Sequence, residues 1–461
     1  MSQAGHRLDL IILREYDIRG LTGKTLTTKD AHAVGRAFGT VVARKGGKRV
    51  HVGRDGRLTS PELEYAAVEG LMECGLEAVR IGLGPTPMLY YATFTRESDA
   101  GLMITGSHNP SEYNGFKMVL QKKAFFGADI LKLGEMAAKA DYASGKGKES
   151  KEDVFESYIK RLASDFQSGK PLTVGWDAGN GSAGPAMAAL VKHLPGKHIL
   201  MHETVDGTFP NHHPDPTVPE NLEQLQALVK REKCDLGIAF DGDGDRIGVV
   251  DGQGRILWGD QLMTVWARGV IERKPGATII ADVKASQVLF DEVRRMGGTP
   301  LMWKTGHSLI KSKMAEVSAP LAGEMSGHIF FADRYYGYDD ALYAAVRLLS
   351  IIGHSQETLA QIRDRLPQVI NTPEIRFPCS DDRKFAVVDE VKDRLGKAKA
   401  DVNDVDGVRV RTKDGWWLLR ASNTQDVLVA RCESTSEDGL KRLKADLVAQ
   451  LTQSGVTPPA M

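Results

Sequence analysis

The chain has 461 residues, which is enough for roughly three or four domains of ordinary size. Its apolar fraction of 42% excludes global disorder, and the equal numbers of basic and acidic residues, 60 each, exclude a net basic field that would hold nucleic acid or an anionic membrane. No apolar run is of membrane-spanning length and the four cysteines are too scattered for a metal or redox motif, so we expect a cytoplasmic protein with neither nucleic acid nor membrane as a partner.

The first part of the chain alternates helix and strand patterns. Helices are predicted at 30–44 and from Ser60, as N-cap, to Cys74; strands are predicted at 49–53, 78–82 and 100–104. This spacing indicates a parallel sheet with right-handed crossovers. The stretch 141–153 is rich in Gly, Ser, Lys and Glu and is predicted to be a linker or surface hinge.

The loop Thr105–Pro110 follows the strand at 100–104 directly. It places Ser107 at the carboxyl end of a strand, where open α/β sheets bind their ligands. We expect Gly106 to let the backbone bend and Pro110 to limit the movement of the loop. With His108 beside it, Ser107 is a candidate nucleophile or phosphoryl carrier; the alternative is a polar turn without a function.

Two further segments repeat this pattern. The second has strands at 172–176 and 235–240, a helix at 220–232, and the loop 241–246; the third has helices at 261–272 and 286–296, strands at 278–282, 300–303 and 320–322, and the loop 323–328. The glycine-rich turn 177–184 is interpreted as a sharp strand-to-helix turn, with ligand binding as the alternative. After about residue 378 the pattern changes to a helix, strands around 408–419, the loop 420–424, a strand and a helix at 437–451, which indicates an α+β unit.

We therefore predict three similar doubly wound α/β domains and a C-terminal α+β domain around a central cleft. The predicted boundaries are 1–150 for the domain with the serine loop, 151–255 for the domain with the aspartate loop, 256–368 for the third and 369–461 for the last.

Asp241, Asp243 and Asp245 are the most specific signal in the sequence. In an extended backbone, residues i, i+2 and i+4 point to one side, so the three carboxylates are predicted to converge. Such charges repel one another unless a cation is present, and oxygen ligands favour Mg²⁺. An EF-hand calcium loop would need a glycine where Arg246 stands and a glutamate where Gly252 stands. A solvated acidic turn is the remaining alternative.

Ser107 and the three aspartates are expected to form one site if the serine carries a phosphate. A bound Mg²⁺ and Arg246 would stabilise that phosphate during its transfer. Lys117 and His108 are candidate proton donors or acceptors for a sugar hydroxyl. Two other loops supply candidate ligand groups: Glu324, Ser326 and His328 for sugar hydroxyls, and Arg420, Ser422, Asn423 and Thr424 for a phosphate that is bound without reacting.

These four loops, in this order, resemble the signature loops of the α-D-phosphohexomutase family, and the likeness spans nearly the whole chain. The resemblance implies an isomerase of carbohydrate metabolism that moves phosphate between the 1 and 6 positions of a hexose. It also implies an active-site phosphoserine, one Mg²⁺ per chain and a hexose 1,6-bisphosphate intermediate and activator.

By position, the resemblance makes Ser107 the phosphoserine and a metal ligand together with Asp241, Asp243 and Asp245. It assigns the sugar O3 and O4 to Glu324 and Ser326, and the non-transferring phosphate to the loop at 420–424. The substrate contacts of bacterial members fall at Tyr16, Arg19, Lys284 and His307. The expected protein is a monomer or weak dimer that takes a phosphosugar.

The motif Gly-Glu-Met-Ser-Gly-His at 323–328 resembles the phosphomannomutase/phosphoglucomutase group, whereas the phosphoglucosamine mutase branch more often has glutamine in place of Met325. One departure from the family pattern is Gln425-Asp426, because Asp426 would repel a phosphate if it faced the site. A Mg²⁺-dependent sugar phosphatase and a non-catalytic sugar-phosphate binding protein are the rival interpretations. Since a bisphosphate has to turn over between two half-reactions, we also predict a mobile last domain with a hinge near 367–378.

Overall fold

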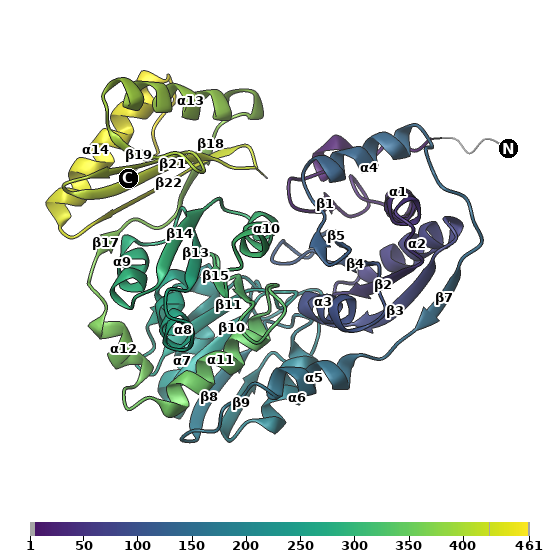
Figure 1. The fold of residues 1–461 in the computed structure, drawn as a ribbon, viewed down its shortest axis with the longest axis horizontal. Helices are drawn as coiled ribbons and strands as arrows, with labels where there is room; N and C mark the ends of the chain where they lie inside the picture. Colours follow the sequence, from purple (N-terminus) through teal and green to yellow (C-terminus); the bar gives the residue numbers. More distant parts are fainter. Residues whose placement is uncertain (1–4, 424, 460–461) are drawn as a thin grey trace.

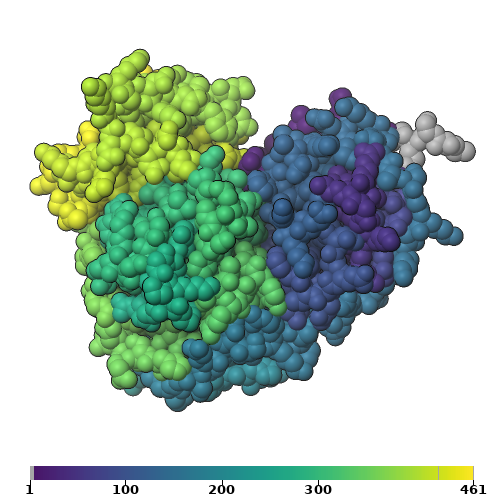
Figure 2. Space-filling model, in the orientation of Figure 1, coloured from purple at the N-terminus to yellow at the C-terminus, as the bar shows by residue number. Residues whose placement is uncertain are grey.

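Within the residues that the computed structural model describes, 5–423 and 425–459, four sheets follow one another along the chain, each covered by helices (Figure 1). The first three are mixed α/β sheets, and the fourth is an antiparallel sheet with helices on it. The predicted fold class is therefore confirmed. The first and fourth sheets lie on opposite sides of the view in Figure 1, and the molecular surface is hollowed between them (Figure 2).

The first sheet has the strand order β1-β5-β4-β2-β3-β7, with β6 paired to β5. Its inner strands are parallel, but β5 runs antiparallel between β4 and β1. The sequence analysis predicted neither β5 nor β7, which lies in the stretch 141–153 expected to be a linker and pairs with β3 at the edge of the sheet. The elements are η1 (Leu10–Ile12), β1 (Ile18–Leu21), α1 (Thr28–Arg44), β2 (Arg49–Arg54), α2 (Ser60–Glu73), β3 (Glu77–Leu83), α3 (Thr86–Thr95), β4 (Ala100–Ile104), β5 (Tyr113–Leu120), β6 (Lys123–Ala124), α4 (Ala128–Ala138) and β7 (Lys148–Lys151).

Local signals mark two of the helix starts in this unit: a capping box at α1 and Pro61 in the first turn of α2. Thr27 and Asp30 form a capping box at the start of α1, in which each side chain accepts from the other residue's backbone N–H. Helix α2 begins one residue earlier than predicted, because Thr59 is the N-cap and Ser60 is the first helical residue. The Ser60 hydroxyl donates instead to Asp55, in the loop after β2.

The second and third sheets repeat one design. Their orders are β12-β11-β10-β8-β9 and β14-β13-β15-β16; β8, β9 and β10 are parallel, as are β13, β14 and β15, and β11 and β16 run antiparallel. The elements are α5 (Phe155–Ala163), β8 (Leu172–Asp177), α6 (Gly184–Leu190), η2 (Val191–His193), β9 (Gly196–Met201), η3 (Pro219–Leu222), α7 (Glu223–Glu232), β10 (Leu236–Phe240), β11 (Ile247–Asp251), β12 (Ile256–Leu257), α8 (Gly259–Arg273), β13 (Thr278–Asp282), α9 (Gln287–Arg295), β14 (Thr299–Trp303), α10 (His307–Val317), β15 (Leu321–Gly323), β16 (Ile329–Phe331), α11 (Ala341–His354) and α12 (Leu359–Arg365).

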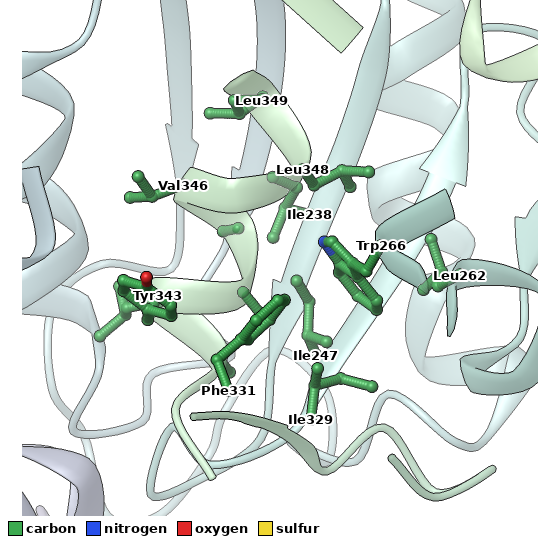
Figure 3. Close-up of a cluster of buried hydrophobic side chains, with 14 of the residues drawn as sticks. Ile238, Ile247, Leu262, Trp266, Ile329, Phe331, Tyr343, Val346, Leu348 and Leu349 are labelled. Carbon is green, nitrogen blue, oxygen red and sulfur yellow. The ribbon is translucent and has the colours of Figure 1, made fainter. Parts of the chain in front are cut away.

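The predicted threefold repeat is visible in these strands. In each unit a buried parallel strand (β4, β10 or β15) ends in a polar loop, and the chain returns antiparallel in the next strand (β5, β11 or β16). The second and third units also share one hydrophobic core. Figure 3 shows Ile238 and Ile247 of the second sheet in one buried cluster with Trp266 of α8, Phe331 of β16 and Tyr343 of α11. This common core fixes the aspartate loop relative to the loop after β15.

The fourth sheet has the order β17-β22-β21-β20-β19, with β18 also paired to β22, and every pairing in it is antiparallel. Arg409 is buried where this unit meets the third: it donates to the carbonyls of Val283 and Ala285 at 2.7 Å each and lies over the Trp416 ring. The elements are β17 (Ile370–Asn371), β18 (Ile375–Pro378), α13 (Asp381–Lys397), β19 (Asp401–Asn403), β20 (Val408–Thr412), β21 (Gly415–Ala421), β22 (Val427–Ser434) and α14 (Glu437–Gln453). Among the described helices, none combines the length and the apolar composition needed to cross a membrane.

Candidate active site

The side chain of Arg57 holds the serine loop in place through hydrogen bonds to its backbone. Its guanidinium is buried and donates to the carbonyls of Ser107, Asn109, Pro110 and Tyr113 at 2.6–3.1 Å. A Cβ on Gly106 would lie 2.1 Å from Arg57 Nε, so glycine is required there by this close approach rather than by its own backbone angle. It is Ser107 that adopts the left-handed conformation, at φ 49°.

The serine loop and the aspartate loop touch. Ser107 Oγ lies 3.1 Å from Asp241 Oδ2, and Asp241 is fully buried. Gly242 makes this approach possible, because a Cβ at that position would lie only 2.4 Å from the Ser107 carbonyl oxygen. The structure thus brings together the two loops that the sequence analysis paired on chemical grounds.

Asp241, Asp243 and Asp245 converge, but not through the extended backbone that the sequence predicted. The loop is a turn, with Gly244 at φ 74°, in which the backbone N–H groups of Asp245 and Arg246 donate to Asp241 Oδ1 at 3.1 Å each. One carboxylate oxygen from each aspartate lies within 4.8 Å of the other two, and all three residues are fully buried. A tight turn brings the carboxylates together more closely than a pleated strand could.

This donor set fits a hard divalent cation. It consists of carboxylate oxygens from three aspartates of one loop, and Asp243 Oδ1 is buried without a hydrogen-bond partner among the described residues. Burial and the neighbouring carboxylates raise the pKa of Asp241 well above its ordinary value, because both destabilise its charged form. Such a site favours a bound cation.

Lys117, on β5, points into the same cluster. Its ammonium group donates to Asp243 Oδ2 at 2.8 Å and also to Asp245. Although burial opposes it, these carboxylates raise the pKa of Lys117 well above its ordinary value, so the side chain stays charged. Lys117 is therefore suited to stabilising negative charge, and its raised pKa favours neither loss nor uptake of a proton near neutral pH. The hydroxyls of Thr86 and Thr105 also donate to Asp243, at 2.5 and 3.0 Å.

Two histidines near the serine differ in charge. Burial and the cationic side chains of Arg246 and Arg19 hold the pKa of His108 well below its ordinary value, and its Nδ1 lies 3.3 Å from Ser107 Oγ. Burial would also lower the pKa of His328, but Asp245, 3.2 Å from its Nε2, raises that pKa to about 9. His108 is therefore neutral and His328 positive near neutral pH.

The guanidinium group of Arg19 has N–H donors without a partner among the described residues. One of its terminal nitrogens donates to Asp17, whereas Nε and Nη1 are buried without partners in the described ranges. Arg246 makes only a long ion pair, with Asp215 at 4.0 Å. Unpartnered guanidinium N–H groups in a buried pocket suit a phosphate group.

Glu324, Ser326 and His328 also lie together, in a loop that forms a turn. Gly327, at φ 89°, donates its N–H to the Glu324 carbonyl, and His328 Nδ1 lies 2.9 Å from Glu324 Oε2 and 3.3 Å from Ser326 Oγ. The other Glu324 oxygen accepts from the N–H of Gly306. An isolated bridge between Arg246 and His328 joins this loop to the aspartate loop.

Tyr16 connects the first, third and fourth units. Its hydroxyl donates to the Thr305 carbonyl and accepts from Asn423 Nδ2, both at 2.8 Å. Arg420 donates to Asp406 at 3.0 Å, and the same carboxylate accepts from the N–H of Thr305. The fourth loop thus reaches the site, with Ser422 buried beside it. Thr424, which was predicted to bind phosphate, lies outside the described residues.

Three other predicted residues can be placed. Lys284 Nζ lies 3.0 Å from Glu374, at the passage into the fourth unit, and 3.6 Å from Asp282. His307 is the first residue of α10, and its ring lies 6.0 Å from that of Tyr16. Asp426 is exposed to solvent, directly before β22. The repulsion expected if Asp426 faced a bound phosphate stays a prediction.

The sequence analysis did not identify the residues that hold the backbone of the serine loop in place, among them Arg57 and His213. His213 Nε2 lies 2.5 Å from the His108 carbonyl oxygen, and Asp55 accepts from the N–H of Gly106 at 2.9 Å. One signal was available, because Arg54-Asp55-Gly56-Arg57 is a polar segment after a strand, like the loops that were selected.

Four family models match the chain in order. They are described as phosphoglucomutase/phosphomannomutase alpha/beta/alpha domain I (residues 11–141), domain II (156–254) and domain III (258–370), and as the C-terminal domain of the same proteins (374–450). The chain belongs to the phosphoglucomutase/phosphomannomutase family. The resemblance found in the four loops is confirmed.

Relatives in this family match over almost their whole length. A phosphomannomutase/phosphoglucomutase of Pseudomonas aeruginosa is 46% identical over 95% of both chains, and a phosphoglucomutase of Neisseria gonorrhoeae is 40% identical over 94% of this chain and 95% of its own. A crystal structure of a phosphoglucomutase/phosphomannomutase family protein from Burkholderia thailandensis superposes with a TM-score of 0.92 at 42% identity, over 98% of this chain and 99% of the other. All four units of the family are therefore present here.

Proposed function

We propose that this protein is a phosphohexomutase that interconverts hexose 1-phosphates and hexose 6-phosphates, of mannose, glucose or both, through a phosphoserine at position 107 and a hexose 1,6-bisphosphate intermediate. The observation that carries the proposal is the contact between Ser107 Oγ and the buried aspartate cluster, 3.1 Å from Asp241, with the charged Lys117 on the same cluster. Family membership supports the reaction type.

In the proposed transfer, the bond between phosphorus and Ser107 Oγ breaks as a sugar hydroxyl oxygen bonds to phosphorus. The proton of that hydroxyl goes to a nearby neutral group, and His108 is the candidate because it is neutral and its Nδ1 lies 3.3 Å from Ser107 Oγ. Arg19 and Lys117 stabilise the negative charge on the moving phosphoryl group. Reversal of these steps at the other end of the bisphosphate regenerates the phosphoserine.

Ser107, Asp241, Asp243 and Asp245 are the proposed ligands of one Mg²⁺. When bound, this ion would supply positive charge beside the transferring phosphoryl oxygens. Hexose 1,6-bisphosphate is the proposed activator, because it can phosphorylate Ser107.

The remaining residues are proposed to bind the substrate. Glu324 and Ser326 accept and donate hydrogen bonds to vicinal hydroxyls, and His328 lies beside them as a cation. Arg246 lies between this loop and the aspartates. The other residues that we propose contact the sugar or its non-transferring phosphate are Tyr16, Lys284, His307, Arg420, Ser422, Asn423 and Thr424. The proposal keeps four domains, at 1–150, 151–255, 256–368 and 369–461.

A coupled assay tests the proposal directly. Glucose, mannose and glucosamine 1-phosphates are each supplied with Mg²⁺ and a trace of hexose 1,6-bisphosphate, and the 6-phosphate formed is measured. We expect turnover of the glucose or mannose ester, loss of turnover in Ser107→Ala with ligand binding retained, and one added phosphate on the wild-type protein by intact mass. The matched control is Ser111→Ala, which changes an exposed serine on the same segment.

Each rival has a distinct outcome in this assay. Inorganic phosphate as the main product would replace the mutase with a phosphatase. A clear preference for glucosamine 1-phosphate would assign the protein to phosphoglucosamine mutases, and binding without turnover of any ester would make it a non-catalytic binding protein.

A further inference from the structure

A second group of metal-ligating side chains lies in the second unit, outside the residues of the proposed active site. Asp177 ends β8, His202 follows β9, and His212 stands in the loop between β9 and η3. One ligand atom from each of the three lies within 4.8 Å of the other two. Asp177 is fully buried, and the side chain of His212 is 11% exposed. Three separate segments thus meet at one point.

The hydrogen bonds around the two imidazoles fix their protons. His212 Nδ1 lies 3.0 Å from the carbonyl oxygen of His213, which can only accept, so this nitrogen carries a proton. His202 Nε2 lies 2.9 Å from Gln224 Oε1, and the Gln224 amide is oriented by its own donation to the Asn211 carbonyl at 3.1 Å. Each ring therefore has an outward N–H with an acceptor and, in its neutral form, a lone pair on its other nitrogen.

This is the arrangement that metal-binding histidines show in proteins, where the second ring nitrogen donates to a carbonyl or carboxylate outside the coordination shell. His212 Nε2 lies 2.9 Å from Asp177 Oδ2, and the other Asp177 oxygen accepts from the N–H of Gly179. A proton shared between His212 and Asp177 would account for that pair alone. It would not account for His202, whose ring lies 5.4 Å from that of His212 in an edge-on arrangement.

We propose that Asp177, His202 and His212 bind a Zn²⁺ ion. Two imidazole nitrogens and one carboxylate oxygen are a common ligand set for zinc, with water in the fourth position. In a tetrahedral site with bonds of about 2.0–2.1 Å, ligand atoms stand about 3.4 Å apart, so the Asp177–His212 pair needs only a small outward movement. Binding displaces the proton that the two residues share.

The ion would join the glycine-rich turn after β8 to the loop that supports the active site. His212 is followed by His213, which contacts the His108 carbonyl, and by Pro214, whose carbonyl accepts from the N–H of Gly242 at 3.2 Å. A Cβ on Gly179 would lie 2.9 Å from Pro214, which shows how closely the two segments pack. Zinc at this point stabilises the support of both the serine loop and the aspartate loop, and gives the turn 177–184 a ligand-binding role.

The test uses the full-length protein, stripped with EDTA, dialysed and then saturated with Mg²⁺ so that the Asp241 cluster is occupied. Zn²⁺ is titrated by equilibrium dialysis with elemental analysis. We expect one Zn²⁺ per chain, a rise in melting temperature, and an anomalous peak at the zinc edge between Asp177, His202 and His212 in crystals. His202→Ala loses this zinc, whereas His193→Ala, which alters an exposed histidine of the same unit, keeps it.

Gln224 gives a second variant that is safe for folding, because its side chain is exposed on α7. Gln224→Ala removes the acceptor of His202 and weakens zinc binding about 10- to 100-fold. Gln224→Glu keeps an acceptor oxygen for His202 and restores zinc binding. Zinc uptake that disappears at saturating Mg²⁺, that is unchanged in both His202→Ala and Gln224→Ala, or that gives an anomalous peak at the aspartate cluster alone would overturn the proposal.

Discussion

The contact between the serine loop and the aspartate loop depends on the absence of one methyl group, which makes Gly242→Ala the sharpest test of the site. The added Cβ would lie 2.4 Å from the Ser107 carbonyl oxygen, whereas ordinary contacts begin at 3.4 Å. The clashing atom is a backbone oxygen, so the strain cannot be relieved by turning a flexible side chain. The two loops must therefore separate by about 1 Å, which widens the Ser107–Asp241 contact beyond hydrogen-bonding distance.

A displacement of this size has a large effect on catalysis and a smaller one on stability. Misplacing a reacting group by about 1 Å lowers the rate about 10²-fold, which corresponds to about 2.7 kcal/mol of transition-state stabilisation. Overpacking of a buried contact lowers the free energy of unfolding by about 1–3 kcal/mol. We therefore expect a folded variant with a greatly reduced kcat.

The assay is coupled formation of hexose 6-phosphate from hexose 1-phosphate, with kcat and KM measured separately and folding followed by thermal unfolding. Gly269→Ala is the matched control, because a Cβ there meets its nearest neighbour at an ordinary 3.7 Å within α8. A folded Gly242→Ala protein whose kcat stays within about threefold of wild type would refute the argument that catalysis depends on this approach.

Three further predictions follow from buried charges. Lys117→Met removes the lysine charge that Asp243 and Asp245 share and lowers the free energy of unfolding by about 3–5 kcal/mol, and added Mg²⁺ restores part of this in thermal melts. Arg57→Lys leaves buried carbonyls of the serine loop unsatisfied, at about 1–3 kcal/mol each, and lowers kcat together with the melting temperature. Burial raises the pKa of Glu374, but Lys284 and Arg376 lower it by more, to about 2, which is below its unfolded value. The stabilising contribution of the Glu374 charge is therefore complete above about pH 4.5 and is lost as the pH falls towards 2. The difference in unfolding free energy between wild type and Glu374→Gln, about 3 kcal/mol at pH 7, therefore shrinks across that window in urea titrations.

Matched controls are exposed residues of the same type: Lys123→Met, Arg411→Lys and Glu437→Gln. Mg²⁺ that leaves the melting temperature of Lys117→Met unchanged would contradict the view that lysine and metal compensate the same charges. Wild-type kcat in Arg57→Lys would show that the serine loop holds its shape without the guanidinium. A constant difference between wild type and Glu374→Gln from pH 7 to pH 3 would disprove the assigned pKa shift.

Strand β5 shows where prediction from sequence fails. Its residues carry no strong alternation, and Asn114-Gly115 looks like a turn, yet Phe116 is fully buried between β4 and β1. Tertiary pairing overrides the local preference there. The loop at 241–246 fails in another way: the convergence of its carboxylates was predicted, but through a wrong backbone geometry, because a turn with Gly244 at positive φ was not recognised.

The sequence by itself determined the α/β class, the four loops and their chemical types, because buried strands, helix caps and charged turn residues are local patterns. Only the tertiary structure decided which side chains meet. Lys117 reaches Asp243 across 126 positions of sequence, and Arg57 holds a loop 50 positions away. The charge state of a buried group depends on such distant neighbours, so the neutral His108 and the charged His328 follow from packing, and no local pattern distinguishes them.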